Sequence, residues 1–229
     1  NRLLNKSLVT NKILPGQTII LTSYQMNVND TLGLLHDFTV VKNRGTGPMD
    51  YVIRTVVSGV EGYDLPNIKS NPVPLDLKNA HARGVWPSSD LSVTLPQYKI
   101  GAENEVTYTI SNGQTDDLFT AYNSLVLPES SISNKGHFGV EYKVEIPYVN
   151  ATNKPKTIQV RIGSRGGTYS GAIKTKYGVY NIPTIEAAKD VAIALNEKVI
   201  PHSSGMIELS IVHAGGASLP IAINVRTIE

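Results

Sequence analysis

Short segments that alternate apolar and polar residues, or are apolar throughout, constrain this chain more than any other feature. Gly, Pro, Asn and Asp bound these segments, which is the pattern of strands in a β-sandwich. We expect strands at residues 17–26, 36–41, 51–57, 91–95, 105–110, 139–149, 157–162, 206–212 and 220–228. Because the strands occupy both halves of the chain and are joined mostly by loops, a doubly wound α/β fold is excluded.

One segment departs from the strand pattern and predicts a short helix over residues 185–196. Thr184 is placed to cap its N-terminus, and Glu186 lies in its first turn, where a negative charge is favourable. Its apolar residues recur at helical spacing: Ile185, Ala188, Val191, Ala192 and Leu195.

A weak internal repeat relates the two halves of the chain. The stretch "VVKNRGTGPMDYVIR" at residues 40–54 returns as "YVNATNKPKTIQVR" at residues 148–161, with Asn, Pro and Arg at the same spacing. Each copy is a strand, an Asn-x-x-x-x-Pro turn and a second strand. We therefore predict two tandem immunoglobulin-like sandwiches, residues 1–116 with an N-terminal leader strand and residues 117–229 with the inserted helix. The alternative is one large sandwich of two similar halves.

Composition excludes several classes of function. A net charge of +2 over 229 residues provides no basic stripe for nucleic acid. No apolar run approaches the roughly 18 residues that cross a membrane. The chain has no cysteine, which removes disulfides, thiolate catalysis and cysteine-bound metals.

The same composition favours an extracellular protein. The chain is rich in Thr, Ser, Asn, Val and Tyr and begins with Asn1, so we expect a processed surface protein or a fragment of a longer precursor. Asn5, Asn29 and Asn150 stand in Asn-x-Ser/Thr contexts, and the sequence leaves open whether they carry glycans.

No familiar catalytic spacing is present. The chain has no Gly-x-Ser-x-Gly elbow, no Gly-x-Gly-x-x-Gly, no Walker loop and no His-Glu-x-x-His. The five histidines are far apart along the chain and form no short-range ligand pair. We therefore expect a protein that is not an enzyme.

Two parts of the sequence are candidate ligand sites. Asn112, Asp116 and Asp117 lie at the expected junction of the two halves and could bind calcium through oxygen ligands, the alternative being a solvated acidic turn. Trp86, the only tryptophan, could stack on a polysaccharide, the alternative being burial in a core or rim.

The N-terminal segment is apolar and has no counterpart in the second half. It could close its own sandwich, or it could insert into the open edge of a neighbouring subunit. Its candidate assembly residues are Leu3, Leu4, Leu8, Val9 and Ile13. The partners expected from this mode are copies of the chain or other surface proteins.

Two stretches carry a resemblance to a known group. Residues 133–174, "SNKGHFGVEYKVEIPYVNATNKPKTIQVRIGSRGGTYSGAIK", and residues 213–225, "HAGGASLPIAINV", resemble uncharacterised extracellular β-rich proteins of Gram-positive bacteria. Some of those proteins carry a copper-amine-oxidase N-terminal-like module. The resemblance implies secretion and a β-sandwich, and it supplies no catalytic residues.

These observations favour a non-enzymatic structural or adhesive protein of the cell surface. Such a protein could be a self-assembling subunit of a filament or matrix that uses N-terminal strand exchange. The alternative is a glycan-binding module of a cell-wall-associated protein, for which Trp86 is the discriminating residue.

Overall fold

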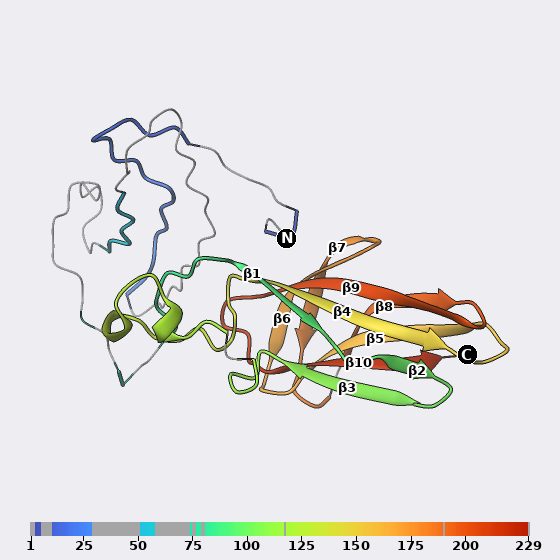
Figure 1. The fold of residues 1–229 in the computed structure, drawn as a ribbon. Helices are drawn as coiled ribbons and strands as arrows, with labels where there is room; N and C mark the ends of the chain where they lie inside the picture. Colours follow the sequence, from blue (N-terminus) through green and yellow to red (C-terminus); the bar gives the residue numbers. More distant parts are fainter. Residues whose placement is uncertain are drawn as a thin grey trace. The chain divides into compact units, whose positions relative to one another are not determined.

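In the computed structural model the chain divides into two units: an N-terminal unit, Leu8–Leu75, and a sandwich unit, Asn1–Ser7 with Asp76–Glu229. The structure describes residues 3–5, 11–28, 51–57, 74, 77–78, 81–116, 118–189 and 191–228. Every strand of the described residues lies in the sandwich unit (Figure 1).

The described part of the sandwich unit contains ten strands and two short 3-10 helices. The strands are β1 (Asp90–Thr94), β2 (Tyr98–Ile100), β3 (Glu105–Ile110), β4 (Glu141–Asn150), β5 (Lys156–Ser164), β6 (Tyr169–Thr175), β7 (Gly178–Ile185), β8 (Val191–Val199), β9 (Ser203–His213) and β10 (Ile221–Ile228). The helices η2 (Ala121–Asn123) and η3 (Pro128–Ser130) lie in the connection between β3 and β4.

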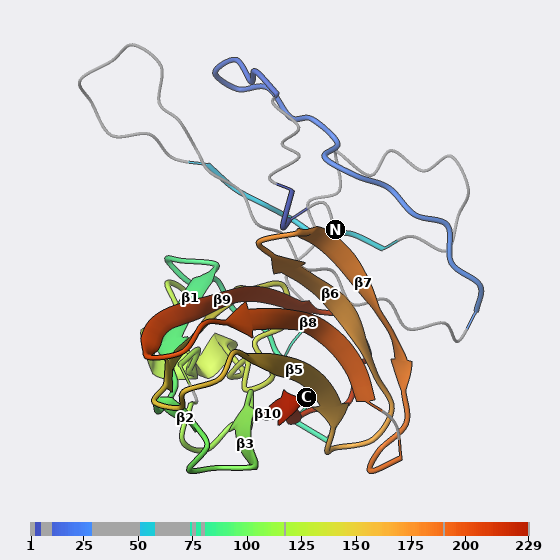
Figure 2. The same cartoon turned by 90° about the vertical axis from the view of Figure 1, so that its right-hand side faces the viewer.

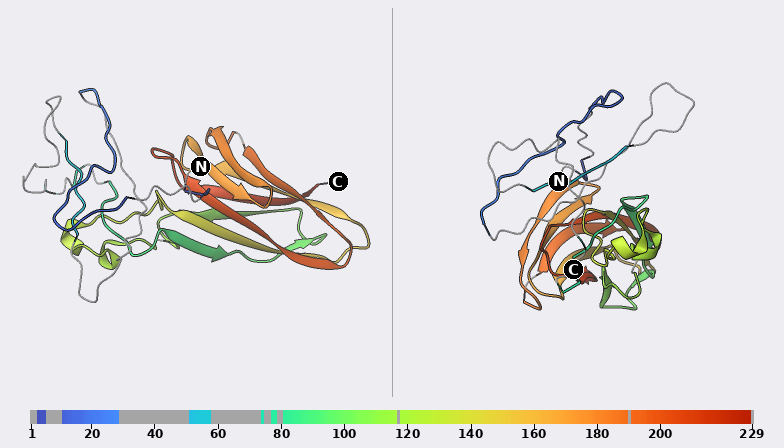
Figure 3. Two further views of the ribbon diagram at one scale, coloured as in Figure 1. Left: turned by 90° about the horizontal axis from the view of Figure 1, so that it is seen from above. Right: turned by 90° about the vertical axis from the view of Figure 1, so that its left-hand side faces the viewer.

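The strands form two sheets that pack face to face, which confirms the predicted all-β sandwich. The larger sheet has the order β1-β4-β9-β6-β7, and β2 pairs with β4 farther along the same strand. The smaller sheet has the order β3-β10-β5-β8. Only the pairings of β1 and β2 with β4 are parallel. The left view of Figure 3 shows the sheets as stacked layers.

The core lies between the two sheets and follows from period-2 alternation. On β5, Ile158, Val160 and Ile162 are fully buried, and the residues between them point to the opposite face of the sheet. β10 repeats the pattern with Ile221, Ile223 and Val225. The facing sheet contributes the fully buried side chains Val144, Ile146 and Ile211. Alternate residues of a strand point to one face, so each strand presents one apolar row to the other sheet.

A division at residues 116 and 117 into two separate sandwiches does not describe these sheets. β3 precedes that boundary and pairs with β10 near the C-terminus, with Ile110 opposite Ile221. β1 also precedes it and pairs with β4. The described strands therefore form one sandwich, and its immunoglobulin-like topology stays a prediction.

Six of the expected strands coincide with observed ones. They are those at residues 91–95, 105–110, 139–149, 157–162, 206–212 and 220–228. The expected strand at residues 36–41 lies outside the described residues. The expected strands at residues 17–26 and 51–57 are wrong for this structure, because neither segment forms regular secondary structure there.

The predicted helix over residues 185–196 is also wrong. β7 ends at Ile185, a turn follows, and β8 begins at Val191. Ala188 in that turn has φ +57°, a left-handed conformation that a continuing right-handed helix cannot contain.

A β-bulge explains why this segment resembled a helix. The pairing of β8 with β5 shifts between Leu195 and Ile193, so that Ala194 is an extra residue on β8. As a result Ala192 and Leu195, three residues apart, both pack against the core. Residues three apart lie on one face of a helix, and the bulge puts residues three apart on one face of this strand as well.

The Asn-x-x-x-x-Pro turn of the second repeat is well defined. Asn150 ends β4 and is fully buried, and its Nδ2 donates to the carbonyls of Lys154 and Ile200 at 3.0 and 3.1 Å. Its Oδ1 accepts hydrogen bonds from the backbone N–H and the hydroxyl of Thr152. Asn43 and Pro48, the matching residues of the first repeat, lie outside the described residues.

Candidate functional site

Polar side chains from four segments meet in a buried cluster at one end of the sandwich. Ser111 follows β3, and its Oγ lies 2.9 Å from Nε2 of His213, the last residue of β9. The same Oγ lies 3.1 Å from Nδ1 of His137, which precedes β4. The hydroxyl of Tyr169, at the start of β6, lies 3.0 Å from Nδ1 of His213. The hydrogen bonds therefore join both sheets.

A turn after β3 positions Ser111. Asp116 accepts hydrogen bonds from the backbone N–H groups of Ser111 and Asn112, and the hydroxyl of Tyr142 donates to it at 3.2 Å. Ser111 has φ +53°, in the left-handed region that non-glycine residues rarely adopt. The carboxylate thus holds a backbone conformation that places the Ser111 hydroxyl between the two histidines.

Burial dominates the electrostatics of the cluster. Burial, with a smaller contribution from the nearby His137, lowers the pKa of His213 to about 3, and Asp116 acts in the opposite direction. Burial also raises the pKa of Tyr169 and of Tyr142, and Asp116 contributes to the rise at Tyr142. His213 is therefore neutral at pH 7, and so are both tyrosines.

Serine, histidine and aspartate together suggest nucleophilic catalysis, but burial points to another role. Ser111 is 3% exposed and His137 is 0% exposed, so a substrate cannot reach the hydroxyl in this structure. A general base works best when its pKa is near the working pH, and the pKa of His213 is far below it. The arrangement is suited to joining the ends of β3, β6 and β9.

The predicted calcium residues use their oxygens within the protein. Asn112 Oδ1 accepts from the backbone N–H groups of Gln114 and Thr115, and both oxygens of Asp116 accept hydrogen bonds. Asp117 lies outside the described residues. Among the described residues, no three His, Asp or Glu side chains are grouped as metal ligands.

Trp86 is half-buried in the loop region beyond the sheets. Its Nε1 donates to the carbonyl of Thr120 at 3.0 Å, and its ring centroid lies 5.5 Å from that of Phe119. A Cβ added to Gly84 would lie 2.9 Å from the indole ring, so the ring covers that glycine. This is the packing of a structural tryptophan, and it gives the glycan-binding alternative no support.

The predicted assembly residues have different environments. Leu4 belongs to the sandwich unit and is 1% exposed, while Leu3 is half-buried. Leu8 and Val9 lie outside the described residues. Ile13 is 52% exposed in the N-terminal unit. Among the described residues of this segment, Leu4 is therefore buried and Ile13 is exposed.

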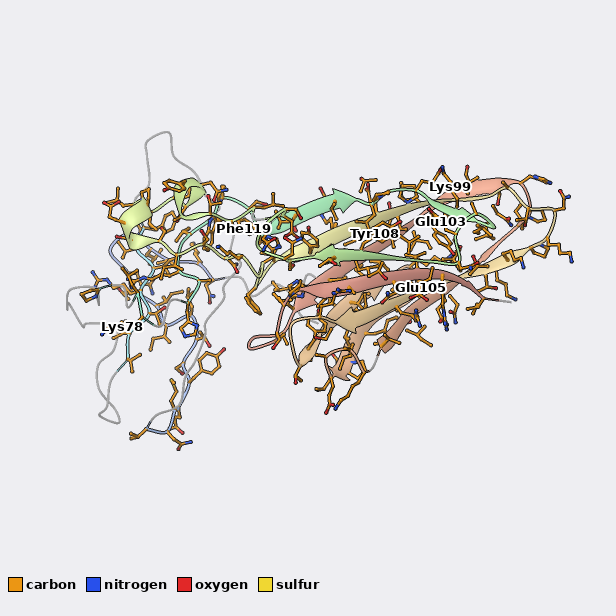
Figure 4. All side chains as sticks on the ribbon, turned by 90° about the horizontal axis from the view of Figure 1, so that it is seen from below. Lys78, Lys99, Glu103, Glu105, Tyr108 and Phe119 are labelled. Carbon is orange, nitrogen blue, oxygen red and sulfur yellow. The ribbon has the colours of Figure 1, made fainter. Side chains whose placement is uncertain are left out.

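The two long sides of the sandwich differ in how they are closed. On the side of β2 and β3, the hydroxyl of Tyr108 donates to the carbonyl of Pro96 at 2.9 Å, which connects the two sheets. Tyr98 and Thr227, also from opposite sheets, have hydroxyl oxygens 2.9 Å apart. Figure 4 labels Tyr108 and Glu103 on this side.

The other side lies between β7 and β8, the edge strands of opposite sheets (Figure 2). One end of it is held by an ion pair of 2.5 Å between Lys176 and Glu197. At the other end lies a cavity of about 250 Å³, whose lining includes Ile182, Ala192 and Ile193. We call this opening the β7–β8 gap.

Sequence reasoning missed the buried cluster and the β7–β8 gap. Ser111 is 26 residues from His137 and 102 residues from His213, so no local motif contains them. The gap was missed because no strand was expected at β7 and a helix was expected over most of β8. The signal available in the sequence was an uncharged stretch that contains Val191 and Ile193, and both residues are exposed in the structure.

Comparison with known proteins gives no assignment. No protein-family model, no curated protein and no solved structure matches this chain. Within the described part of the chain, no helix has the length and apolar character that crossing a membrane requires.

Proposed function

We propose that this protein is a non-enzymatic structural or adhesive protein of the cell surface, which assembles with copies of itself by strand exchange. The sandwich unit is the rigid body of the subunit. An apolar segment of the N-terminal unit is the donor strand. Because such a segment completes its pairing only in a neighbour, each subunit both donates and accepts, and a chain of subunits results.

The observation that carries the proposal is the exposure of the donor segment, residues 13–28. Its exposed large apolar side chains are Ile13 52%, Leu14 58%, Ile20 60%, Leu21 53%, Tyr24 61%, Met26 41% and Val28 91%. Large apolar side chains exposed in such number along one segment are candidates for an interaction surface.

The donor segment has the sequence of a strand but is not paired as one. The stretch "QTIILTSYQM" at residues 17–26 is rich in β-branched and aromatic residues. Nevertheless, residues 11–28 take part in no sheet within the described part of the chain. A backbone that is extended and apolar gains hydrogen bonds and burial when it joins a sheet edge.

The proposed donor lies farther along the chain than the sequence alone suggested. Leu4 belongs to the sandwich unit and is already buried, so it is not available to a neighbouring subunit. The proposed donor therefore begins at Ile13 rather than at Leu3. The extracellular location remains an expectation from composition.

Light scattering of the purified chain at increasing concentration tests the proposal. We expect the molar mass to rise above the 24.8 kDa of one chain. The double variant Ile20→Lys/Tyr24→Lys should remain at the mass of one chain, because both residues lie on the same face of an extended strand and a charge there opposes burial.

The matched control is Tyr122→Lys in η2. Tyr122 is 89% exposed, so its replacement removes a similar apolar surface from the sandwich unit and leaves the donor segment intact. The control should assemble like the natural chain. A natural chain that stays at 24.8 kDa up to its highest soluble concentration would overturn the proposal.

A further inference from the structure

At the β7–β8 gap two sheet edges lie next to each other, and neither has a further strand beside it among the described residues. β7 and β8 are consecutive along the chain, yet they end opposite sheets, and no ladder joins them. Pro183 on β7 has no N–H to donate, which makes β7 the poorer of the two edges for an added strand. The bulge at Ala194 lies in the pairing of β8 with β5.

Small side chains create the cavity in the gap. Ala192 and Ala194 occupy the inward positions of β8 beside Ile182 of β7. An apolar side chain at such a position on a neighbouring strand would fill the space that the alanines leave. The cavity volume of about 250 Å³ is below the roughly 300–1,000 Å³ of ordinary small-molecule pockets. It is suited to side chains of a strand.

The cavity end of the gap has several exposed apolar side chains at its rim and no charged one on β7 or the first half of β8. Val191 is 48% exposed, Ile193 is 60% exposed, and Tyr180 on the facing strand is 47% exposed. Neither β7 nor the first half of β8 contains a charged residue. Edge strands are usually protected by charges, and here the only charges of the two strands, Glu197 and Lys198, lie at the far end of β8.

The donor segment matches this rim in charge and length. Residues 13–28 contain no charged side chain, so they can lie beside β7 and the uncharged first half of β8 without leaving an unpaired charge buried. The strand-like stretch at residues 17–26 spans ten residues, and β8 spans nine. A charged or highly polar partner lacks this match.

We infer that the β7–β8 gap is the acceptor site for the donor segment of a second copy of this chain. In that complex, residues 17–26 lie beside β8 and place an apolar side chain over Ala192 and Ala194. The inference rests on the proposed function and names the acceptor surface that the proposal leaves open. The two can fail separately, as the outcomes below show.

Disulfide trapping tests the inference directly, because the chain has no cysteine of its own. One preparation carries Ile20→Cys and a second carries Ile193→Cys. After mixing and oxidation, we expect a linked pair of chains on a non-reducing gel. Its yield should exceed by about tenfold the yield with a control acceptor, because pairing holds the two Cα atoms within the roughly 7 Å that a disulfide requires.

The control acceptor is Lys143→Cys, an exposed position on β4. A second readout avoids oxidation: Ile193→Lys should keep the chain at the mass of a monomer, and its circular dichroism should match that of the natural chain. Because Ile193 is largely exposed, this change leaves the core intact.

The possible outcomes distinguish the inference about the acceptor site from the proposed function. The inference is supported if the disulfide yield at residue 193 exceeds the yield at the control acceptor and if Ile193→Lys prevents assembly. Assembly that depends on residues 13–28 but gives equal trapping at both acceptors overturns the inference and leaves the proposed function standing. Trapping within a single chain that carries both cysteines, unaffected by dilution, overturns the second copy as occupant. A natural chain without assembly overturns both.

Discussion

The sandwich unit and the N-terminal unit contain similar sequence patterns with different structural outcomes. On β5, Ile158, Val160 and Ile162 alternate with polar residues and are fully buried. In the N-terminal unit, Ile20 and Val52 lie in equally strand-like stretches and are 60% and 75% exposed. The local signal is the same in both cases.

The difference lies in the availability of a partner. β5 pairs with β10 on one side and with β8 on the other, and its apolar row faces a second sheet. Residues 17–26 and 51–57 take part in no ladder in the described part of the chain. β-propensity measures how well a side chain fits a paired and half-buried surface. A strand-like segment therefore forms a strand only where a paired surface is available, and a second copy of the chain can provide that surface.

The largest expected difference between the units comes from core truncation. Ile223→Ala on β10 removes a fully buried side chain and should lower the free energy of unfolding by about 2–5 kcal/mol, because a cavity remains. Ile20→Ala should change it by less than about 0.5 kcal/mol, as for other exposed positions. Urea unfolding of both variants below the concentration of assembly measures the contrast. An equal loss in the two variants would show that the N-terminal unit is packed in the monomer.

The sequence predicts the fold best where one strand follows its local pattern without interruption. β3, β4, β5, β9 and β10 were expected within a few residues of their observed ends. β8 was mistaken for a helix because the bulge at Ala194 changes its inward spacing from two residues to three. The pairing of β3 with β10 joins residues more than a hundred positions apart, and no local pattern specifies it.

The candidate sites show the same limit. Trp86 and Asp116 were recognisable as unusual residues, but their partners Thr120, Phe119 and Tyr142 were not, because the tertiary fold brings them together. Ile13 was identified as an assembly residue and is exposed, whereas Leu4 was identified on the same grounds and is buried. An apolar run predicts contact, and only the fold decides whether the contact is internal.

Acid should weaken the sandwich unit through its buried histidine. The pKa of His213 is about 3 in the folded chain and about 6.5 when unfolded, so stability is complete above pH 6.5 and falls as the unfolded chain binds a proton. The expected loss is about 1.4 kcal/mol per pH unit, or about 3 kcal/mol by pH 4. Urea unfolding between pH 7 and pH 4 measures it.

Two variants isolate this effect from the titration of carboxylates. His213→Gln cannot bind the proton, so its stability should fall less steeply between pH 6.5 and pH 4 than that of the natural chain. His202→Gln replaces an exposed histidine at the turn before β9 and should retain the natural slope. Equal slopes in all three chains would mean that His213 does not carry the acid sensitivity.

The smallest expected difference concerns the repeated turn and compares the two units residue by residue. Asn150→Ala removes a fully buried donor from the carbonyls of Lys154, Val199 and Ile200, which should cost about 1–3 kcal/mol in urea unfolding. Asn43 is the matching residue of the first repeat, and the stretch that follows it, residues 51–57, forms no strand. We therefore expect Asn43→Ala to cost less than Asn150→Ala in the monomer, because residues 51–57 form no strand after it. If strand exchange completes the first repeat, Asn43→Ala should lower the free energy of unfolding more in the assembled protein than in the monomer. Equal losses in the two states would mean that the first repeat takes no part in assembly.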